Sequence, residues 1–138
     1  MNSFHEFGLV EPIARALTEE KYVTPTPIQA KAIALVLAGR DLIGIAQTGT
    51  GKTAAFALPI LNRIAANRIR PERKTCRVLV LSPTRELSGQ ILDSFRAYGR
   101  HMRISSALAI GGVSMPSSAS GVRLRSTPRR IATASAWR

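Results

Sequence analysis

Residues 46–53, which read AQTGTGKT, restrict the fold of this chain more than any other segment. Gly49 and Gly51 allow backbone conformations that other residues avoid, so consecutive N–H groups can face inward around an anion. In a loop of this kind, Lys52 can reach the terminal phosphates of a nucleotide and Thr53 can bind a magnesium ion. The sequence therefore predicts a phosphate-binding loop.

The segments on either side of the loop support this interpretation. Residues 41–46 are apolar enough for a buried parallel strand, and residues 53–67 predict a helix. One face of that helix carries four large apolar side chains: Phe56, Ile60, Leu61 and Ile64. Pro59 lies inside it and is expected to kink the helix or to end its first segment. A helix N-terminus directly after the loop favours anions through its dipole and its unpaired N–H groups.

Alternating helix and strand patterns predict an α/β fold. Further helices are expected at 12–21, 28–38 and 85–98, and further strands at 78–81 and 104–110. Gly39 is expected to cap the helix at 28–38, and Thr84 the helix at 85–98. Strands separated by helices form a parallel sheet, and ligands gather at the carboxyl ends of its strands. Loops 47–51, 82–84 and 111–112 are expected to lie at that edge.

The composition indicates which kind of binding partner and which cellular compartment to expect. The chain has 138 residues, about one domain, and 20 Lys and Arg against 8 Asp and Glu, a net charge of +12. Such an excess indicates a polyanionic partner such as nucleic acid. Cys76 is the single cysteine, so no internal disulfide can form. We expect a cytoplasmic protein, since its start is unlike a signal peptide and no apolar stretch reaches the roughly 18 residues of a membrane span.

Several separated segments resemble the DEAD-box ATP-dependent RNA helicases, and their sequences are most similar to the bacterial RhlE-like members. These segments are residues 3–9 (SFHEFGL), 24–29 (TPTPIQ), 46–53, 83–88 (PTRELS) and 111–112. The resemblance covers residues 3 to about 115 and implies the front part of a RecA-like lobe, a parallel sheet flanked by helices. By this resemblance the chain derives from an ATP hydrolase.

The resemblance implies a nucleotide site. The amide of Gln29, in the family's Q motif, would bind the edge of adenine, and Phe4 would stack on its ring. Eight residues would surround the phosphates of ATP: Ala46, Gln47, Thr48, Gly49, Thr50, Gly51, Lys52 and Thr53. Thr53 would also bind Mg²⁺. Without the family, Gln29 is better interpreted as a residue on a helix surface.

The resemblance also implies contacts with the RNA backbone. They would come from Pro83, Thr84, Arg85 and Glu86 and from Gly111 and Gly112. A capped helix N-terminus, an arginine and glycine N–H groups can all bind phosphates without reading bases. The alternative for both segments is an ordinary turn. The basic connector 68–77 could also touch nucleic acid, although a solvated loop is the simpler interpretation.

The chain departs from the family pattern at two positions. Lys21 stands where the family usually has glycine, which bears on the local turn. Ser88 stands where alanine usually ends the motif at 83–88, a mild change.

Hydrolysis needs a second-strand carboxylate to organise magnesium and a group to orient water. In this family both come from an Asp-Glu-Ala-Asp segment, yet no acidic residue follows Asp93. We therefore expect a truncated helicase lobe that binds ATP and RNA without hydrolysis or unwinding. The alternatives are a small basic RNA-binding module with a vestigial loop and a product without function.

Residues 116–138 differ in character from the rest, with five arginines and no acidic residue. Arg, Ser, Ala and Pro are what GC-rich codons yield out of frame, so we hypothesise a frame shift near residue 115 and a disordered tail. We accordingly divide the chain into a Q-motif region (1–30), a partial RecA-like ATP-binding domain (31–115) and a basic tail (116–138).

Overall fold

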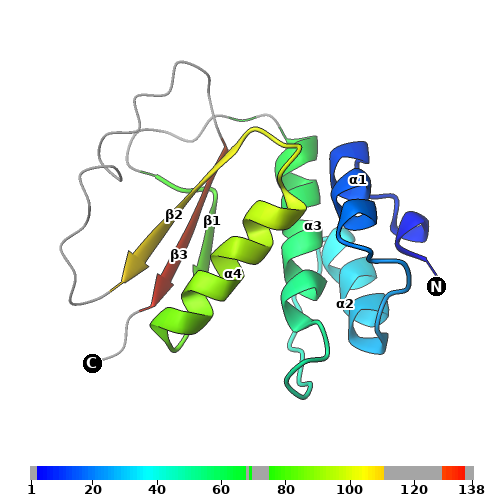
Figure 1. Ribbon diagram of the computed structural model, residues 1–138, viewed down its shortest axis with the longest axis horizontal. Coiled ribbons are helices and arrows are strands. Elements are labelled where there is room, and N and C mark those ends of the chain that lie inside the picture. Colours follow the sequence, from blue (N-terminus) through cyan, green and yellow to red (C-terminus); the bar gives the residue numbers. More distant parts are fainter. Residues whose placement is uncertain (1–2, 68, 70–74, 111–128, 136–138) are drawn as a thin grey trace. The chain divides into compact units, whose positions relative to one another are not determined.

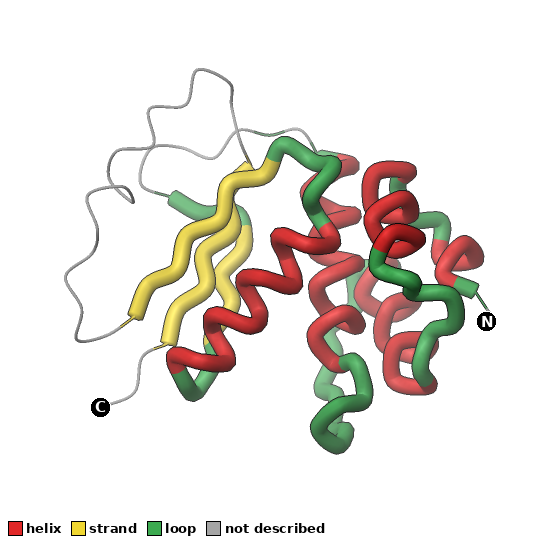
Figure 2. The backbone as a smooth tube through the Cα atoms, viewed as in Figure 1, coloured by secondary structure: helices red, strands yellow, loops and turns green. Residues whose placement is uncertain are grey.

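The computed structural model describes residues 3–67, 69, 75–110 and the strand at 129–135 (Figures 1 and 2). The chain divides into two compact units. The first consists of Met1–Arg68 and Ala97–Met102, and the second of Ile69–Arg96 and Arg103–Arg138. No helix among the described residues is both long and apolar enough to cross a membrane.

The first unit is built from helices. They are η1 (Phe4–Phe7), α1 (Glu11–Glu19), α2 (Pro27–Leu37) and α3 (Lys52–Ala66) (Figure 1). Helix α2 packs along α3, and α1 contacts α3 as well. The largest fully buried apolar side chains are Ile13, Leu17, Ile33, Leu58, Leu61 and Ile64. The backbone N–H of Val10 donates to Asn62 Oδ1 of α3 at 2.8 Å, which ties the start of α1 to this core.

Helix α3 differs from the expected helix in two ways. It runs unbroken through Pro59, so the expectation that proline would end its first segment is wrong. Pro59 is buried, and packing compensates for the backbone hydrogen bond that proline cannot donate. Phe56 and Ile60 are half-buried, whereas the small residues Ala54 and Ala57 face the core, so the buried face is rotated from the expected one.

The strand expected at residues 41–46 is absent from the structure. Residues 41–47 belong to no regular element, and Leu42, Ile43 and Ile45 are 42%, 93% and 94% exposed. An apolar run becomes a buried strand only where neighbouring strands flank it. Among the described residues, the three strands of the sheet pair with one another and leave this segment unpaired.

The second unit contains the sheet. Its elements are β1 (Val78–Leu81), helix α4 (Arg85–Tyr98, of which the last two residues belong to the first unit), β2 (Ile104–Ile110) and β3 (Arg129–Ser135). The strand order is β1-β3-β2 and all pairs are parallel. Thr133 of β3 lies between Val80 of β1 and Leu108 of β2. The expected strands at 78–81 and 104–110 and the expected helix at 85–98 are confirmed.

Strand β3 corrects one expectation. Residues 129–135 were expected in a disordered tail, yet they form the central strand of the sheet. The basic composition argued against order, but backbone pairing with β1 on one side and β2 on the other stabilises this strand. Residues 116–128 and 136–138 lie outside the described residues, and the frame-shift hypothesis stays a prediction.

An aromatic cluster and a polar network fix the end of α1 within the first unit. Tyr22 packs on Phe4, with ring centroids 5.8 Å apart, and its hydroxyl lies 3.0 Å from that of Tyr98. Burial, and then the hydrogen bond with Tyr22, raises the pKa of Tyr98. Hydrogen bonds within the unit therefore join α1 and its following turn to the segment 97–102.

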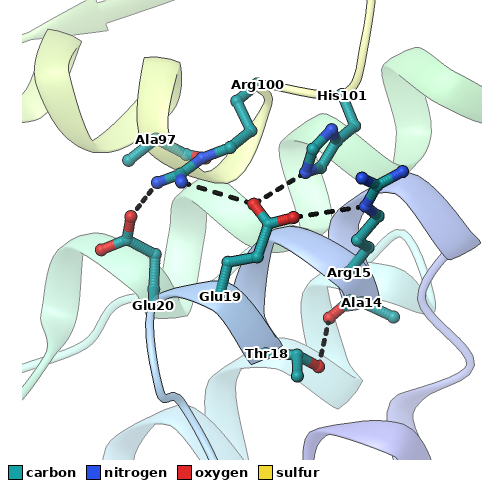
Figure 3. A network of polar contacts seen from close by, with 8 residues as sticks. All are labelled: Ala14, Arg15, Thr18, Glu19, Glu20, Ala97, Arg100 and His101. Atoms are coloured by element: carbon teal, nitrogen blue, oxygen red, sulfur yellow. Dashed lines mark hydrogen bonds and ion pairs between the residues drawn. The ribbon is translucent and has the colours of Figure 1, made fainter.

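Figure 3 shows the polar network around Glu19. Its carboxylate contacts Arg15 at 3.2 Å, His101 at 2.8 Å and Arg100 at 3.4 Å. Arg100 also pairs with Glu20 and donates to the carbonyl of Ala97 at 3.0 Å. The hydrogen bond from His101 lowers the pKa of the Glu19 carboxyl, and the charges of His101 and Arg15 lower it further.

Lys21 ends α1 in a conformation that suits glycine. The backbone N–H of Tyr22 donates to the carbonyl of Leu17 at 2.8 Å, and Lys21 itself has φ +60°. Helix α2 ends in the same way, with Gly39 at φ +80°. A lysine in this left-handed conformation is strained where glycine is not. The departure from the family at position 21 is therefore a strained helix end.

We expect Lys21→Gly to raise the free energy of unfolding, by a few tenths to about 1 kcal/mol, because relief of strain exceeds the entropy that glycine adds to the unfolded chain. Urea denaturation measures the change. The matched variant Gly39→Ala should lower stability by about 1 kcal/mol, since open space surrounds Gly39 and the backbone conformation alone opposes alanine. A loss of stability in Lys21→Gly would contradict this account.

The lowered pKa of Glu19 predicts a dependence of stability on pH. A carboxyl whose pKa is lower in the folded state stabilises the fold above its unfolded pKa, and this contribution disappears as the pH falls through the folded pKa. We expect Glu19→Gln to reduce the decline in unfolding free energy measured in urea between about pH 5 and pH 2.5. A decline in Glu19→Gln as steep as that of the wild type would contradict this account.

Candidate nucleotide-binding site

Gln29 is buried beside the glycine-rich loop, with 2% of its surface exposed. The side chain of Thr26 caps α2 by accepting from the backbone N–H of Gln29 at 3.4 Å, and Gln29 Oε1 accepts in return from the N–H of Thr26 at 2.9 Å. Its amide Nε2 donates to the carbonyl of Gly51 at 3.2 Å. The interpretation of Gln29 as a helix-surface residue is therefore wrong.

Thr26 also contacts the loop. Its hydroxyl donates to the carbonyl of Thr50 at 2.9 Å. Together with the Gln29 contact, this bond fixes two consecutive carbonyls, those of Thr50 and Gly51. In a planar trans peptide the C=O and the following N–H point in opposite directions, so the N–H groups of Gly51 and Lys52 face away from Thr26 and Gln29.

Two further side chains hold the first half of the loop. The hydroxyl of Thr50 donates to the carbonyl of Gln47 at 2.7 Å. The ammonium group of Lys52 donates to the carbonyls of Ala46 and Gln47 at 2.5 and 2.6 Å. Four carbonyls of residues 46–51 thus accept hydrogen bonds from side chains. In each of these four peptides, the N–H group points away from the side chain that holds the carbonyl.

Glycine conformations and a helix N-terminus complete the site. Gly49 and Gly51 have φ +79° and +82°, which supports the expected use of glycine in this loop. Helix α3 begins at Lys52, and its first N–H groups have no acceptor within the helix. The half-buried Thr53 lies in that first turn. Outward carbonyls, first-turn amides and a lysine form an arrangement that can hold an anion.

Phe4 is packed rather than open. It is 4% exposed, and its ring centroid lies 6.0 Å from that of Phe7 and 5.8 Å from that of Tyr22. Its expected stacking on adenine stays a prediction.

The expected RNA-contacting residues belong to the second unit. Pro83, Thr84, Arg85 and Glu86 are exposed, and Thr84 Oγ1 accepts from the N–H of Leu87 at 3.2 Å, which confirms Thr84 as the cap of α4. Gly111 and Gly112 lie outside the described residues, as does most of the basic connector.

Sequence reasoning missed the part played by Thr26. The pattern Thr-x-x-Gln at 26–29 is a capping box and could have identified both residues as partners. It also missed the buried pair Ser82 and Ser88, whose hydroxyls bond to each other at the start of α4. Ser88 replaces the family's alanine and so adds a buried polar contact.

The fold and the loop place the chain among the α/β proteins that carry a phosphate-binding loop. The family model of the DEAD/DEAH box helicases matches residues 26–137, and the chain belongs to this family. The match includes most of the segment 116–138.

Proteins with sequences similar to this chain carry the names of helicases. The chain is 45% identical over 113 residues to the ATP-dependent rRNA helicase RRP3 of Yarrowia lipolytica, covering 82% of this chain and 22% of that protein. It is 47% identical over 113 residues to the DEAD-box ATP-dependent RNA helicase RhpA of Helicobacter pylori, with the same coverage of 82% and 22%. The chain thus spans about a fifth of the length of these curated relatives.

A solved structure agrees with the fold. A hypothetical ATP-dependent RNA helicase from Sulfolobus tokodaii superposes with a TM-score of 0.70 at 36% identity. The likeness covers 91% of this chain and 34% of that chain.

The contact between Gln29 and Gly51 predicts a steric limit at position 51. A Cβ there would overlap the amide nitrogen of Gln29 and lie 3.1 Å from its Cδ, whereas nothing lies within 4 Å at Gly49. We expect Gly49→Ala to cost about 1 kcal/mol of unfolding free energy, from its backbone conformation alone, and Gly51→Ala to cost roughly 2–3 kcal/mol. Urea denaturation of both variants measures the difference, and equal losses would contradict the packed contact.

Proposed function

We propose that this stretch of chain binds ATP, with the phosphates in loop 46–53 and the adenine beside Gln29. The observation that carries the proposal is the buried Gln29 amide, which fixes the loop through Gly51 and keeps hydrogen-bonding capacity. Nε2 has a second hydrogen and Oε1 a second lone pair, the donor and acceptor that an adenine edge requires. The ATP-dependent relatives support the choice of nucleotide.

We propose Lys52 as the phosphate contact and Thr53 as one ligand of Mg²⁺. The residues present fit these roles, because a lysine follows the loop and a hydroxyl lies in the first turn of α3. Magnesium would supply charge neutralisation between the phosphates when bound. Among the described residues, no group of three or more His, Cys, Asp or Glu could hold a metal by itself.

We propose RNA as the partner, with contacts to its backbone from the N-terminus of α4. Thr84 caps this helix and Arg85 lies exposed beside it, which favours phosphate binding without base specificity. The net charge of +12 and the RNA helicases among the relatives support this partner. We also propose a cytoplasmic location, supported by the single cysteine.

We propose that these 138 residues alone do not hydrolyse ATP or unwind RNA. Phosphoryl transfer needs a carboxylate that organises magnesium and a group that orients water. The sequence contains no acidic residue after Asp93, so the family's Asp-Glu-Ala-Asp segment is missing from it.

A second candidate is a basic RNA-binding module in which the loop no longer binds nucleotide. The observation in its favour is that the Lys52 ammonium is engaged by carbonyls of its own loop. RNA binding that falls steeply with salt and is indifferent to ATP and to Lys52→Ala would support this candidate.

Titration with N-methylanthraniloyl-ATP tests the first proposal. We expect saturable binding that weakens at least about tenfold in Lys52→Ala, which loses a charged phosphate contact, and in Gln29→Ala, which loses the loop contact. Magnesium should strengthen binding, and no phosphate should be released over hours.

Matched variants control this experiment. Lys31→Ala and Gln90→Ala remove the same side-chain types at exposed positions on α2 and α4, and both should bind as the wild type does. An absence of saturable binding by the wild type would contradict the nucleotide site and favour the RNA-binding module.

A further inference from the structure

Thr50 joins two hydrogen bonds at the centre of the loop. Its hydroxyl donates to the carbonyl of Gln47 at 2.7 Å, and its own carbonyl accepts from the hydroxyl of Thr26 at 2.9 Å. The general phosphate-loop pattern specifies its first residue and the final glycine, lysine and hydroxyl residue, and it leaves position 50 open. The general pattern therefore does not explain the two contacts of Thr50.

The Gln47 carbonyl determines the direction of one loop amide. It belongs to the same planar trans peptide as the N–H of Thr48, and the two groups point in opposite directions. A donor that holds this carbonyl thus also holds the Thr48 N–H toward the other side of the peptide. An N–H fixed in this way can bind an anion without further reorganisation.

Two donors bind the Gln47 carbonyl, and they differ in charge. Lys52 Nζ lies 2.6 Å from it, and the Thr50 hydroxyl lies 2.7 Å from it. A phosphate oxygen carries negative charge and a carbonyl oxygen does not, so Coulomb attraction favours transfer of the ammonium from the carbonyl to a phosphate. The Thr50 hydroxyl, which is neutral, keeps its bond when Lys52 turns to a phosphate.

We propose that Thr50 is a positioning residue that holds the peptide between Gln47 and Thr48 in the orientation that binds nucleotide phosphate. This inference rests on the proposed ATP site. Thr50 acts through the peptide, and through Thr26 it also links the loop to the start of α2.

Thr50→Val tests the inference, because valine keeps the shape of threonine and removes the hydroxyl. In titrations of the full 138-residue chain with N-methylanthraniloyl-ATP, we expect its affinity to fall roughly three- to tenfold, the effect of one net hydrogen bond. Thr50→Ser keeps the hydroxyl and should restore most of the affinity. Urea denaturation of each variant establishes that all are folded under the titration conditions.

Thr18→Val is the matched control. It removes a hydroxyl that donates to the carbonyl of Ala14 at 3.0 Å, the same kind of bond in α1, and should leave nucleotide affinity unchanged (Figure 3). A Thr50→Val affinity within twofold of the wild type, or a Thr50→Ser affinity as weak as that of Thr50→Val, overturns the inference alone. Failure of the wild type to bind overturns the proposed ATP site, and the inference with it.

Discussion

The hydrogen bond from the buried Gln29 amide to the carbonyl of Gly51 is the contact on which the site depends. It requires a residue without Cβ at position 51, because any larger residue would overlap the amide. It also connects the capped start of α2 with the loop that begins α3, within one compact unit. The buried Gln29 side chain thus determines which residue fits at position 51 and how the backbone is oriented at the start of α3.

Local signals predicted the elements whose formation depends on neighbouring residues. The hydroxyl of Thr84 and the apolar spacing after it predicted α4 within its observed bounds. The strands expected at 78–81 and 104–110 were likewise found as β1 and β2. In the loop, the glycines at 49 and 51 were expected to allow conformations that other residues avoid, and both have positive φ. Caps, turns and short-range periodicity are physical properties of a few consecutive residues, so the sequence contains them directly.

Pairing between distant segments could not be predicted in this way. The apolar run at 41–46 has the composition of a buried strand but, among the described residues, no partner strand. The arginine-rich segment at 129–135 lacks that composition, yet it pairs with two parallel strands and forms the centre of the sheet. The burial of Gln29 is a third example, because only the approach of Gly51 gives its polar amide a partner inside the protein. Composition describes a segment, whereas burial depends on what the rest of the chain brings to it.

A loop that binds phosphate must satisfy two opposed requirements. Its N–H groups must stay available for the anion, while its carbonyls need hydrogen-bond donors of their own. Ordinary secondary structure meets the second requirement by pairing N–H with C=O, which would consume the groups that the anion needs. Here the donors are side chains: an amide from Gln29, hydroxyls from Thr26 and Thr50, and the ammonium of Lys52. Three of these four donors are neutral, and in the proposed ATP site a phosphate would compete only for the fourth, the ammonium of Lys52. On this proposal, Lys52 would leave the carbonyls of Ala46 and Gln47 for the ligand, while neutral side chains would still hold the carbonyls of Gln47, Thr50 and Gly51.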